Sequence, residues 1–254
     1  MTAPVAVITG ASRGIGRQLA VDFARAGYDV ACLARSTAES PSKLPGTVDE
    51  TAELVRAEGR RALALAVDVR DEAAVAAAAE RVYGELGRCD VLVNNAAVAV
   101  PGRTLELPTG RWRLAVDVNL NGPLYTVYYF APRMAEHGGG SVINISSGAA
   151  AAPEFGRTSY TVTKAALESL TRCLAHELRD QGIAVNCIRL ELPVWSEGFV
   201  FTLGDVDRSR FEDPVIMSDA ALWLARQPRE YTGQVVTIGE LRALGAVRPP
   251  TRAG

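Results

Sequence analysis

The stretch PVAVITGASRGIG, residues 4–16, joins a short apolar run to a glycine-rich turn. The apolar run shows no alternation with polar residues, which is typical of a strand that is covered on both faces. Gly10, Gly14 and Gly16 allow a tight turn and a close approach to the backbone, and a helical pattern follows them. A strand, a glycine turn and a helix N-terminus together can hold a pyrophosphate. The stretch therefore predicts a dinucleotide-binding fold.

Similar apolar runs recur along the chain and alternate with longer segments that have a helical pattern. This alternation predicts an α/β fold, a doubly wound (Rossmann-type) parallel sheet of about seven strands with helices on both faces. No linker or repeat divides residues 1–254, so we expect a single domain whose ligand crevice lies beyond the carboxyl ends of the strands. The expected strands are 4–9, 28–34, 62–69, 90–95, 141–146, 183–189 and 234–238, and the expected helices are 14–26, 49–58, 71–86, 109–136, 157–181 and 214–226.

The composition excludes several classes of partner. The formal net charge is −2, with 48% hydrophobic and 22% charged residues, so neither nucleic acid nor an anionic membrane is expected to bind. The four cysteines are scattered without a close pair, which favours free thiols in a reducing compartment such as the cytoplasm. His137 and His176 stand far apart, so we expect no metal site.

The end of the second expected strand bears on the choice of cofactor. An acidic residue there would accept hydrogen bonds from the 2′-hydroxyl of NAD, but the sequence reads Ala34-Arg35-Ser36, with no carboxylate until Glu39. Arg35, and also Arg13 in the glycine turn, could pair with a 2′-phosphate, although either could be a solvated surface residue. The pattern favours NADP(H) over NAD.

Further motifs make the chain similar to the short-chain dehydrogenase/reductase family over most of residues 4–189. Ser147 precedes Tyr160 by thirteen residues, which is the usual spacing in that family, and Lys164 follows in a Y-x-x-x-K pattern. The motifs are TGASRGIG at 9–16, Asp68-Val69, NNAA at 94–97, Asn119 within VNLNG, Ser147 within NISSG, and the pair Tyr160 and Lys164.

The resemblance implies a role for each of these residues. Tyr160 would exchange a proton with the substrate oxygen, Ser147 would hold that oxygen, and Asn119 would organise a water-linked proton route behind Lys164. Asp68 would contact the adenine, and Asn94 and its neighbours would line the cofactor cleft. The catalytic set is Asn119, Ser147, Tyr160 and Lys164. The cofactor-binding set is Gly10, Ser12, Arg13, Gly14, Ile15, Gly16, Arg35, Asp68, Val69, Asn95, Tyr160 and Lys164.

The chemistry of the pair agrees with this assignment. Lys164 is four residues after Tyr160, so the two share one face of a helix. A nearby ammonium favours the phenolate form of a tyrosine. Only two of the 27 basic residues are lysines, and a compact ammonium can do here what a planar guanidinium cannot.

The sequence departs from the family after the sixth strand, where Leu190-Glu191 replaces the usual Pro-Gly and Trp195 or Ser196 lies near the usual threonine. We expect residues 190–213 to form a substrate lid or loop. Glu191 either faces the nicotinamide or turns outward. The loop 36–47, which contains KLPGT, resembles a hydroxysteroid-dehydrogenase-like subgroup. Apolar residues that either line a substrate pocket or belong to the core or an interface are Val98, Phe155, Trp195, Phe199 and Phe201.

These features predict an NADP(H)-dependent oxidoreductase that interconverts a carbonyl and a secondary alcohol on a hydrophobic small molecule. The alternative is a dinucleotide-binding protein of the same fold with little or no turnover, used for sensing or assembly. The apolar segments within 109–136 and 157–181 favour a homodimer or a homotetramer.

Overall fold

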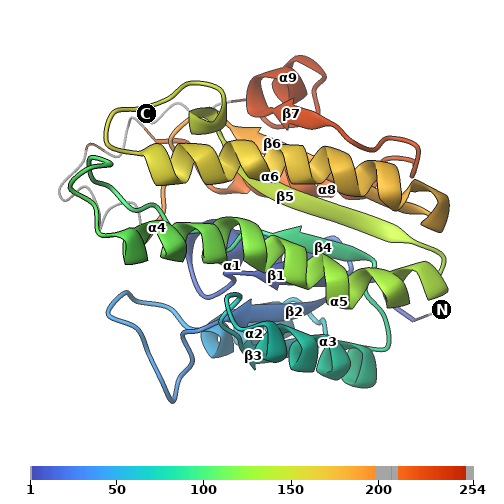
Figure 1. Cartoon of the computed structure of the whole chain (residues 1–254). Coiled ribbons are helices and arrows are strands. Elements are labelled where there is room, and N and C mark those ends of the chain that lie inside the picture. Colours follow the sequence, from blue (N-terminus) through green and yellow to red (C-terminus); the bar gives the residue numbers. More distant parts are fainter. Residues whose placement is uncertain (1, 198–206, 208–210, 250–254) are drawn as a thin grey trace.

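The computed structural model describes residues 2–197, 207 and 211–249, and its centre is a single sheet of seven parallel strands (Figure 1). The strand order is β3-β2-β1-β4-β5-β6-β7, so the predicted doubly wound sheet is confirmed. The strands match the expected ones, except that residues 67–69 lie beyond the third. Their bounds are β1 (Val5–Thr9), β2 (Asp29–Ala34), β3 (Ala62–Ala66), β4 (Val91–Asn94), β5 (Gly140–Ser147), β6 (Ile183–Leu190) and β7 (Val235–Thr237).

Successive side chains of β1 point to opposite faces of the sheet, and each face has its own hydrophobic core. Ala6 and Ile8 pack in a cluster with α1, α2 and α8, whereas Val5 and Val7 pack in a second cluster with α3, α5 and α6. Helices therefore cover both faces, as predicted (Figure 1). The helices are α1 (Gly14–Arg25), α2 (Val48–Ala57), α3 (Glu72–Leu86), α4 (Thr109–Val116), α5 (Gly122–Glu136), α6 (Thr158–Glu177), α8 (Val215–Ala225) and α9 (Ile238–Ala243).

The long helix expected at 109–136 is interrupted by a π-helical turn, Asp117–Asn121, between α4 and α5. The N–H of Gly122 donates to the carbonyl of Asp117, five residues back. Pro123 has no N–H, so it cannot donate to the carbonyl of Asn119 as a regular helix would require. Single π-turns of this kind are frequent at functional sites, and this one contains Asn119.

The topology places a crevice next to the glycine turn. β1 is paired with β2 on one side and with β4 on the other. The chain runs outward from β1 to β2 and β3, and then returns to β4 on the opposite side of β1. In open α/β sheets ligands bind beyond the carboxyl ends of the strands at such a point. Among the described residues, no helix is both long and apolar enough to cross a membrane.

Candidate functional site

The glycine turn between β1 and α1 has a conformation that only glycine adopts easily. Gly10 and Gly14 have φ angles of +68° and +52°. At Gly16 the requirement is for space, because a Cβ would overlap the carbonyl oxygen of Gly10 and lie 2.6 Å from Asn95 Nδ2. The same Asn95 amide donates to the carbonyl of Thr9 at 2.9 Å, so Asn95 holds the shape of the turn.

The N-terminus of α1 has the chemistry to hold an anion. Arg13 is the N-cap residue, and its side chain makes no capping hydrogen bond. The first N–H groups of a helix have no partner within the helix, and they form its positive end. Ser12 is buried in the same turn and Ile15 is half-buried. The turn thus fits a pyrophosphate, which sequence reasoning had predicted.

The side chain of Arg13 binds the loop between β2 and α2. Its Nε donates to the carbonyl of Pro45 at 2.7 Å, and its Nη2 donates to Ser42 Oγ at 2.6 Å. The same Nη2 also reaches the carbonyls of Leu44 and Gly46, at 3.1 and 2.9 Å. Nε and Nη2 of Arg13 therefore bind the loop, while the pairing of Arg13 with a 2′-phosphate stays a prediction.

Arg35 and Asp68 lie at the carboxyl ends of neighbouring strands. Arg35 directly follows β2 and is exposed. Asp68 follows β3, and its carboxylate accepts hydrogen bonds of 2.6–3.0 Å from Arg70. These hydrogen bonds lower the pKa of Asp68, and the charge of Arg35 contributes to the same shift. Val69 is buried beside Gly122, and a Cβ added to Gly122 would lie 3.0 Å from the Cβ of Val69. Sequence reasoning missed Arg70, which is two residues from its partner.

Lys164 connects α6 to the end of β5. Its side chain is 3% exposed, and Nζ donates to the carbonyl of Ile145 at 2.6 Å. Nζ also lies 5.7 Å from the centroid of the Tyr160 ring. Ser147 is the last residue of β5, two residues after Ile145, and its Oγ accepts from Ala149 N at 3.3 Å. The structure therefore brings Lys164 to Tyr160 and to the strand end that carries Ser147.

Asn119 is fully buried in the π-turn and joins three parts of the site. Its Oδ1 accepts from Val98 N at 2.8 Å, and its Nδ2 donates to Val98 O at 2.9 Å. The same Nδ2 also donates to Thr163 Oγ1 at 3.0 Å, directly before Lys164. The side chain thus fixes the segment after β4 against α6, while a water route to Lys164 stays a prediction.

Two further charged groups border this set. The guanidinium carbon of Arg157 lies 4.9 Å from the centroid of the Tyr160 ring, and Nη1 donates to Glu154 at 2.6 Å. Such a cation over an aromatic face is attracted to it. The sequence could have indicated this contact, because a spacing of three residues places Arg157 and Tyr160 on the same side of the start of the helix.

An ion pair with a buried carboxylate lies one helical turn beyond Lys164. Glu168 accepts from Ser146 Oγ at 2.8 Å and from Arg189 at 2.9 and 2.6 Å. Ser146 and Arg189 are register partners on β5 and β6, so Glu168 ties α6 to both strands. Removing one member would leave a buried charge without a partner. In the sequence, only the spacing of four residues between Lys164 and Glu168 indicated that Glu168 lies on the same face of the helix.

A chain of buried amides and hydroxyls crosses the core beneath the site. Thr126 Oγ1 donates to Asn94 Oδ1 at 2.6 Å, and Asn94 Nδ2 donates to Asn144 Oδ1 at 2.9 Å. Asn144 Nδ2 then donates to Thr171 Oγ1 at 2.9 Å. The chain links α5, β4, β5 and α6. These bonds fix Asn94 in the core, and its place in the lining of the cofactor cleft stays a prediction.

The segment after β6 is described at both ends, while 198–206 and 208–210 of the expected lid lie outside the described residues, with Phe199 and Phe201 among them. Trp195 N donates to the carbonyl of Glu212 at 3.0 Å, and the Trp195 ring meets that of Phe211 edge to face at 5.6 Å. Glu191 is exposed, and its Oε2 accepts from Gly239 N at 3.0 Å, in the first turn of α9.

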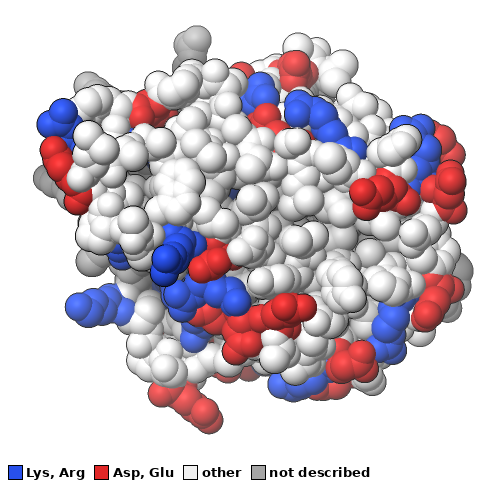
Figure 2. Space-filling view, in the orientation of Figure 1, with Lys and Arg blue, Asp and Glu red and all other residues white. Residues whose placement is uncertain are grey.

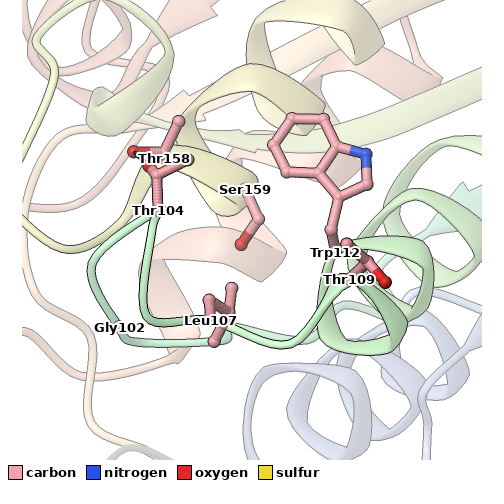
Figure 3. Close-up of a pocket in the computed structure, with 7 residues that line it drawn as sticks. All are labelled: Gly102, Thr104, Leu107, Thr109, Trp112, Thr158 and Ser159. Carbon is pink, nitrogen blue, oxygen red and sulfur yellow. Dashed lines mark hydrogen bonds between the residues drawn. The ribbon is translucent and has the colours of Figure 1, made fainter.

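A hollow of about 180 Å³ lies beside the start of α6. Figure 3 shows Trp112 and Leu107 around this hollow, which is enclosed by α4, α6 and the loop before α4. A second hollow of about 310 Å³ adjoins it and includes Phe155, which is 87% exposed. Of the other apolar candidates, Val98 is half-buried. Sequence reasoning did not find Trp112. The first hollow is lined by Gly102, Thr104, Leu107, Thr109, Trp112, Thr158 and Ser159.

The family model for short chain dehydrogenase matches residues 4–192 of the chain. The chain belongs to the short-chain dehydrogenase/reductase family. A solved short chain dehydrogenase from Mycobacterium paratuberculosis, bound to NAD, superimposes with a TM-score of 0.81. It is 31% identical, and the match covers 92% of this chain and 95% of that one.

Two curated proteins have sequences similar to that of this chain. The 3-oxoacyl-[acyl-carrier-protein] reductase FabG of Staphylococcus aureus is 30% identical over 248 residues, which cover 92% of this chain and 95% of the relative. Hydroxysteroid dehydrogenase-like protein 2 of Bos taurus is 32% identical over 231 residues, covering 90% of this chain. The chain spans about half of that longer relative, since the match covers 55% of it.

Proposed function

We propose that this protein is an NADP(H)-dependent oxidoreductase that interconverts a carbonyl and a secondary alcohol on a hydrophobic small molecule. The observation that carries the proposal is the placement of the buried Lys164 ammonium against both Tyr160 and the end of β5. The glycine turn supports the binding of a dinucleotide, and the nicotinamide, when bound, would supply or accept the hydride.

The proposed roles of the side chains follow from their chemistry. In reduction the Tyr160 phenol gives its proton to the carbonyl oxygen, and in oxidation it takes the proton back. Lys164 has three N–H donors, of which one binds Ile145, so others remain for the phenol and for the ribose of the dinucleotide. Ser147 Oγ holds the substrate oxygen by a hydrogen bond. Asn119 keeps the segment after β4 in place behind them.

A hydrophobic substrate is supported by apolar side chains near the start of α6, the helix that carries Tyr160. The hollow beside α6 is bordered by Trp112 and Leu107, and the adjoining one by Phe155. The names of the similar proteins refer to 3-oxoacyl groups and to hydroxysteroids. Both carry a carbonyl or hydroxyl group on an apolar skeleton. We propose a substrate of this kind.

The experiment that tests the proposal is a steady-state assay of NADPH oxidation with a panel of carbonyl compounds. The panel contains steroid ketones, 3-oxoacyl thioesters and cyclic terpene ketones, with NADH in place of NADPH as the cofactor control. Turnover that prefers NADPH and apolar ketones supports the proposal. Tight dinucleotide binding without turnover would instead support a protein used for sensing or assembly.

Arg35 provides the test of cofactor choice. Only NADPH carries a 2′-phosphate, so Arg35→Ala should weaken NADPH binding by roughly ten- to a hundredfold, the value of one charge-assisted contact, and leave NADH binding almost unchanged. Calorimetric dissociation constants for both cofactors measure the effect. Arg81→Ala, which removes an exposed arginine from α3, is the matched control. Equal weakening of NADPH and NADH binding by Arg35→Ala would show that Arg35 does not read the phosphate.

We also propose that the protein assembles as a homodimer or homotetramer through α5 and α6. These helices lie side by side on one face (Figure 1), and Figure 2 shows that the surface over them carries few charges. Tyr128 on α5 is 67% exposed, and Leu124 and Val162 are also exposed. An exposed apolar surface on a soluble domain is typical of an interface.

Light scattering should therefore give a mass above that of one chain at micromolar concentration. Tyr128→Glu should shift the protein toward the monomer, because it places a charge in the contact. Leu54→Glu, at an exposed position on α2, is the control and should leave the mass unchanged. A wild-type protein that is monomeric throughout would contradict the assembly. The four cysteines are free thiols, which supports a cytoplasmic location.

A further inference from the structure

Residues Ser196 and Glu197 pack directly on the glycine turn, although they lie more than 180 positions away in the sequence. A Cβ built on Gly14 would lie 2.9 Å from Ser196 Cβ and 3.4 Å from Glu197 Oε2. The carboxylate of Glu197 therefore lies over the first residue of α1. This is where an incoming pyrophosphate would meet the helix N-terminus.

Two arginines of this region lie near the charge of Glu197. Its Oε1 lies 4.0 Å from Nη1 of Arg17, on the first turns of α1. Although burial is the main influence on the pKa of Arg13 and lowers it, the charge of Glu197 acts on the same group in the opposite direction. A carboxylate at this end of a helix is stabilised by the helix dipole, as a phosphate would be.

The carboxylate is nevertheless held weakly. Glu197 Oε2 is shielded from solvent and accepts no hydrogen bond from any residue that the structure describes. The contact with Arg17 is long for an ion pair. A shielded carboxylate oxygen without a donor is unfavourable, so an anion with more oxygens, placed to accept several N–H bonds, would displace it.

We propose that Glu197 is an internal anion that competes with the pyrophosphate of the dinucleotide for the N-terminus of α1. Binding of the cofactor must then move residues 195–197 off the glycine turn, because three negative charges cannot share one helix end. Glu197 thus lowers the affinity for the cofactor and couples its binding to the position of residues 195–197. This inference rests on the proposed function, since it concerns the same dinucleotide.

The competition has a signature that separates it from the role of Arg35. The pyrophosphate is common to NADPH and NADH, whereas the 2′-phosphate is found only in NADPH. Removing the charge of Glu197 should therefore change the affinities for both cofactors by the same factor. Removing Arg35 should change only one of them.

The experiment is a calorimetric measurement of the dissociation constants of NADPH and NADH for the wild type and for Glu197→Gln. We expect both cofactors to bind about tenfold more tightly to the variant, the effect of removing one unfavourable charge at a partly solvated site. Inorganic pyrophosphate, used as a probe of the turn alone, should also bind more tightly. Glu197→Ala serves as a second variant and should act in the same direction.

Glu50→Gln is the matched control. Glu50 also faces Arg17, at 3.5 Å, but it lies on α2 and caps that helix through Thr47, which a glutamine can also do. The control removes the same charge from the same arginine without uncovering Gly14, so its dissociation constants should stay within about twofold of the wild type.

Three results would overturn the inference. Unchanged affinities in Glu197→Gln and Glu197→Ala would show that the carboxylate does not compete. Weaker binding of both cofactors would make Glu197 a ligand of the dinucleotide. If the wild type and every variant fail to bind either dinucleotide, the proposed function itself fails, and the competition fails with it.

Discussion

Replacing Tyr160 with phenylalanine should lower kcat by about 10² or more, because the ring is kept and the proton donor is lost. The dissociation constant of NADPH should change little, since the phenyl ring still fills the space below Arg157 and beside Lys164. Steady-state kinetics and calorimetry on the same preparation measure the two quantities. A loss in kcat without a loss in cofactor affinity is what a proton-transfer role requires.

Tyr128→Phe is the control for this prediction, because Tyr128 is an exposed tyrosine of α5 and its hydroxyl has no proposed role in the chemistry. It should keep wild-type kcat. Lys164→Arg should also be poorly active, since a guanidinium does not fit the buried position of the ammonium against the Ile145 carbonyl. Wild-type turnover in a well-folded Tyr160→Phe protein would contradict the mechanism.

Replacing Gly16 with alanine should abolish detectable dinucleotide binding or weaken it by about 10². The backbone of Gly16 is helical, so an alanine meets no strain in φ. The added methyl group would instead overlap the carbonyl oxygen of Gly10 and press on the Asn95 amide. Because both are backbone or tightly hydrogen-bonded groups, the turn itself must move, and the N–H groups that face the pyrophosphate move with it.

Gly84→Ala is the matched control, because Gly84 is also a helical glycine but no atom lies within 4 Å of its added Cβ. It should stabilise α3 by about 1 kcal/mol, the difference in helix propensity between the two residues. Thermal unfolding and NADPH titration of both variants make the comparison. Equal NADPH affinities for Gly16→Ala and the wild type would show that the turn does not bind the dinucleotide in the proposed way.

The sequence was sufficient for the sheet and for the neighbourhood of most site residues. Buried parallel strands are continuous apolar runs, and Tyr160 and Lys164 share a helix face because of their spacing alone, so local patterns determine both. The glycine turn was predictable for the same reason. The π-turn at Asn119 was not, because the helical pattern continues through it and only Pro123 marks the change.

Contacts between distant segments were the part that sequence reasoning could not predict. The approach of Ser42 and Gly46 to Arg13 depends on how the loop after β2 folds back, and nothing in their order along the chain shows it. The position of Glu197 over Gly14 depends in the same way on the path of the chain after β6. Arginine at position 13 has the right chemistry for a phosphate, and only the tertiary structure shows that its Nε and Nη2 bind the loop.

The buried amides of Asn94 and Asn144 have a consequence for engineering the protein. They are register partners on β4 and β5, so a shift of one strand by a single residue would turn one of them to the opposite face. The polar atoms of both would lose their partners, at about 1–3 kcal/mol for each unsatisfied group. Ser147 lies three residues after Asn144 on β5. The register that the two amides fix in the core therefore also fixes the position of Ser147 along the strand. Loops that surround the substrate can be exchanged for new specificities while the reacting groups keep their spacing.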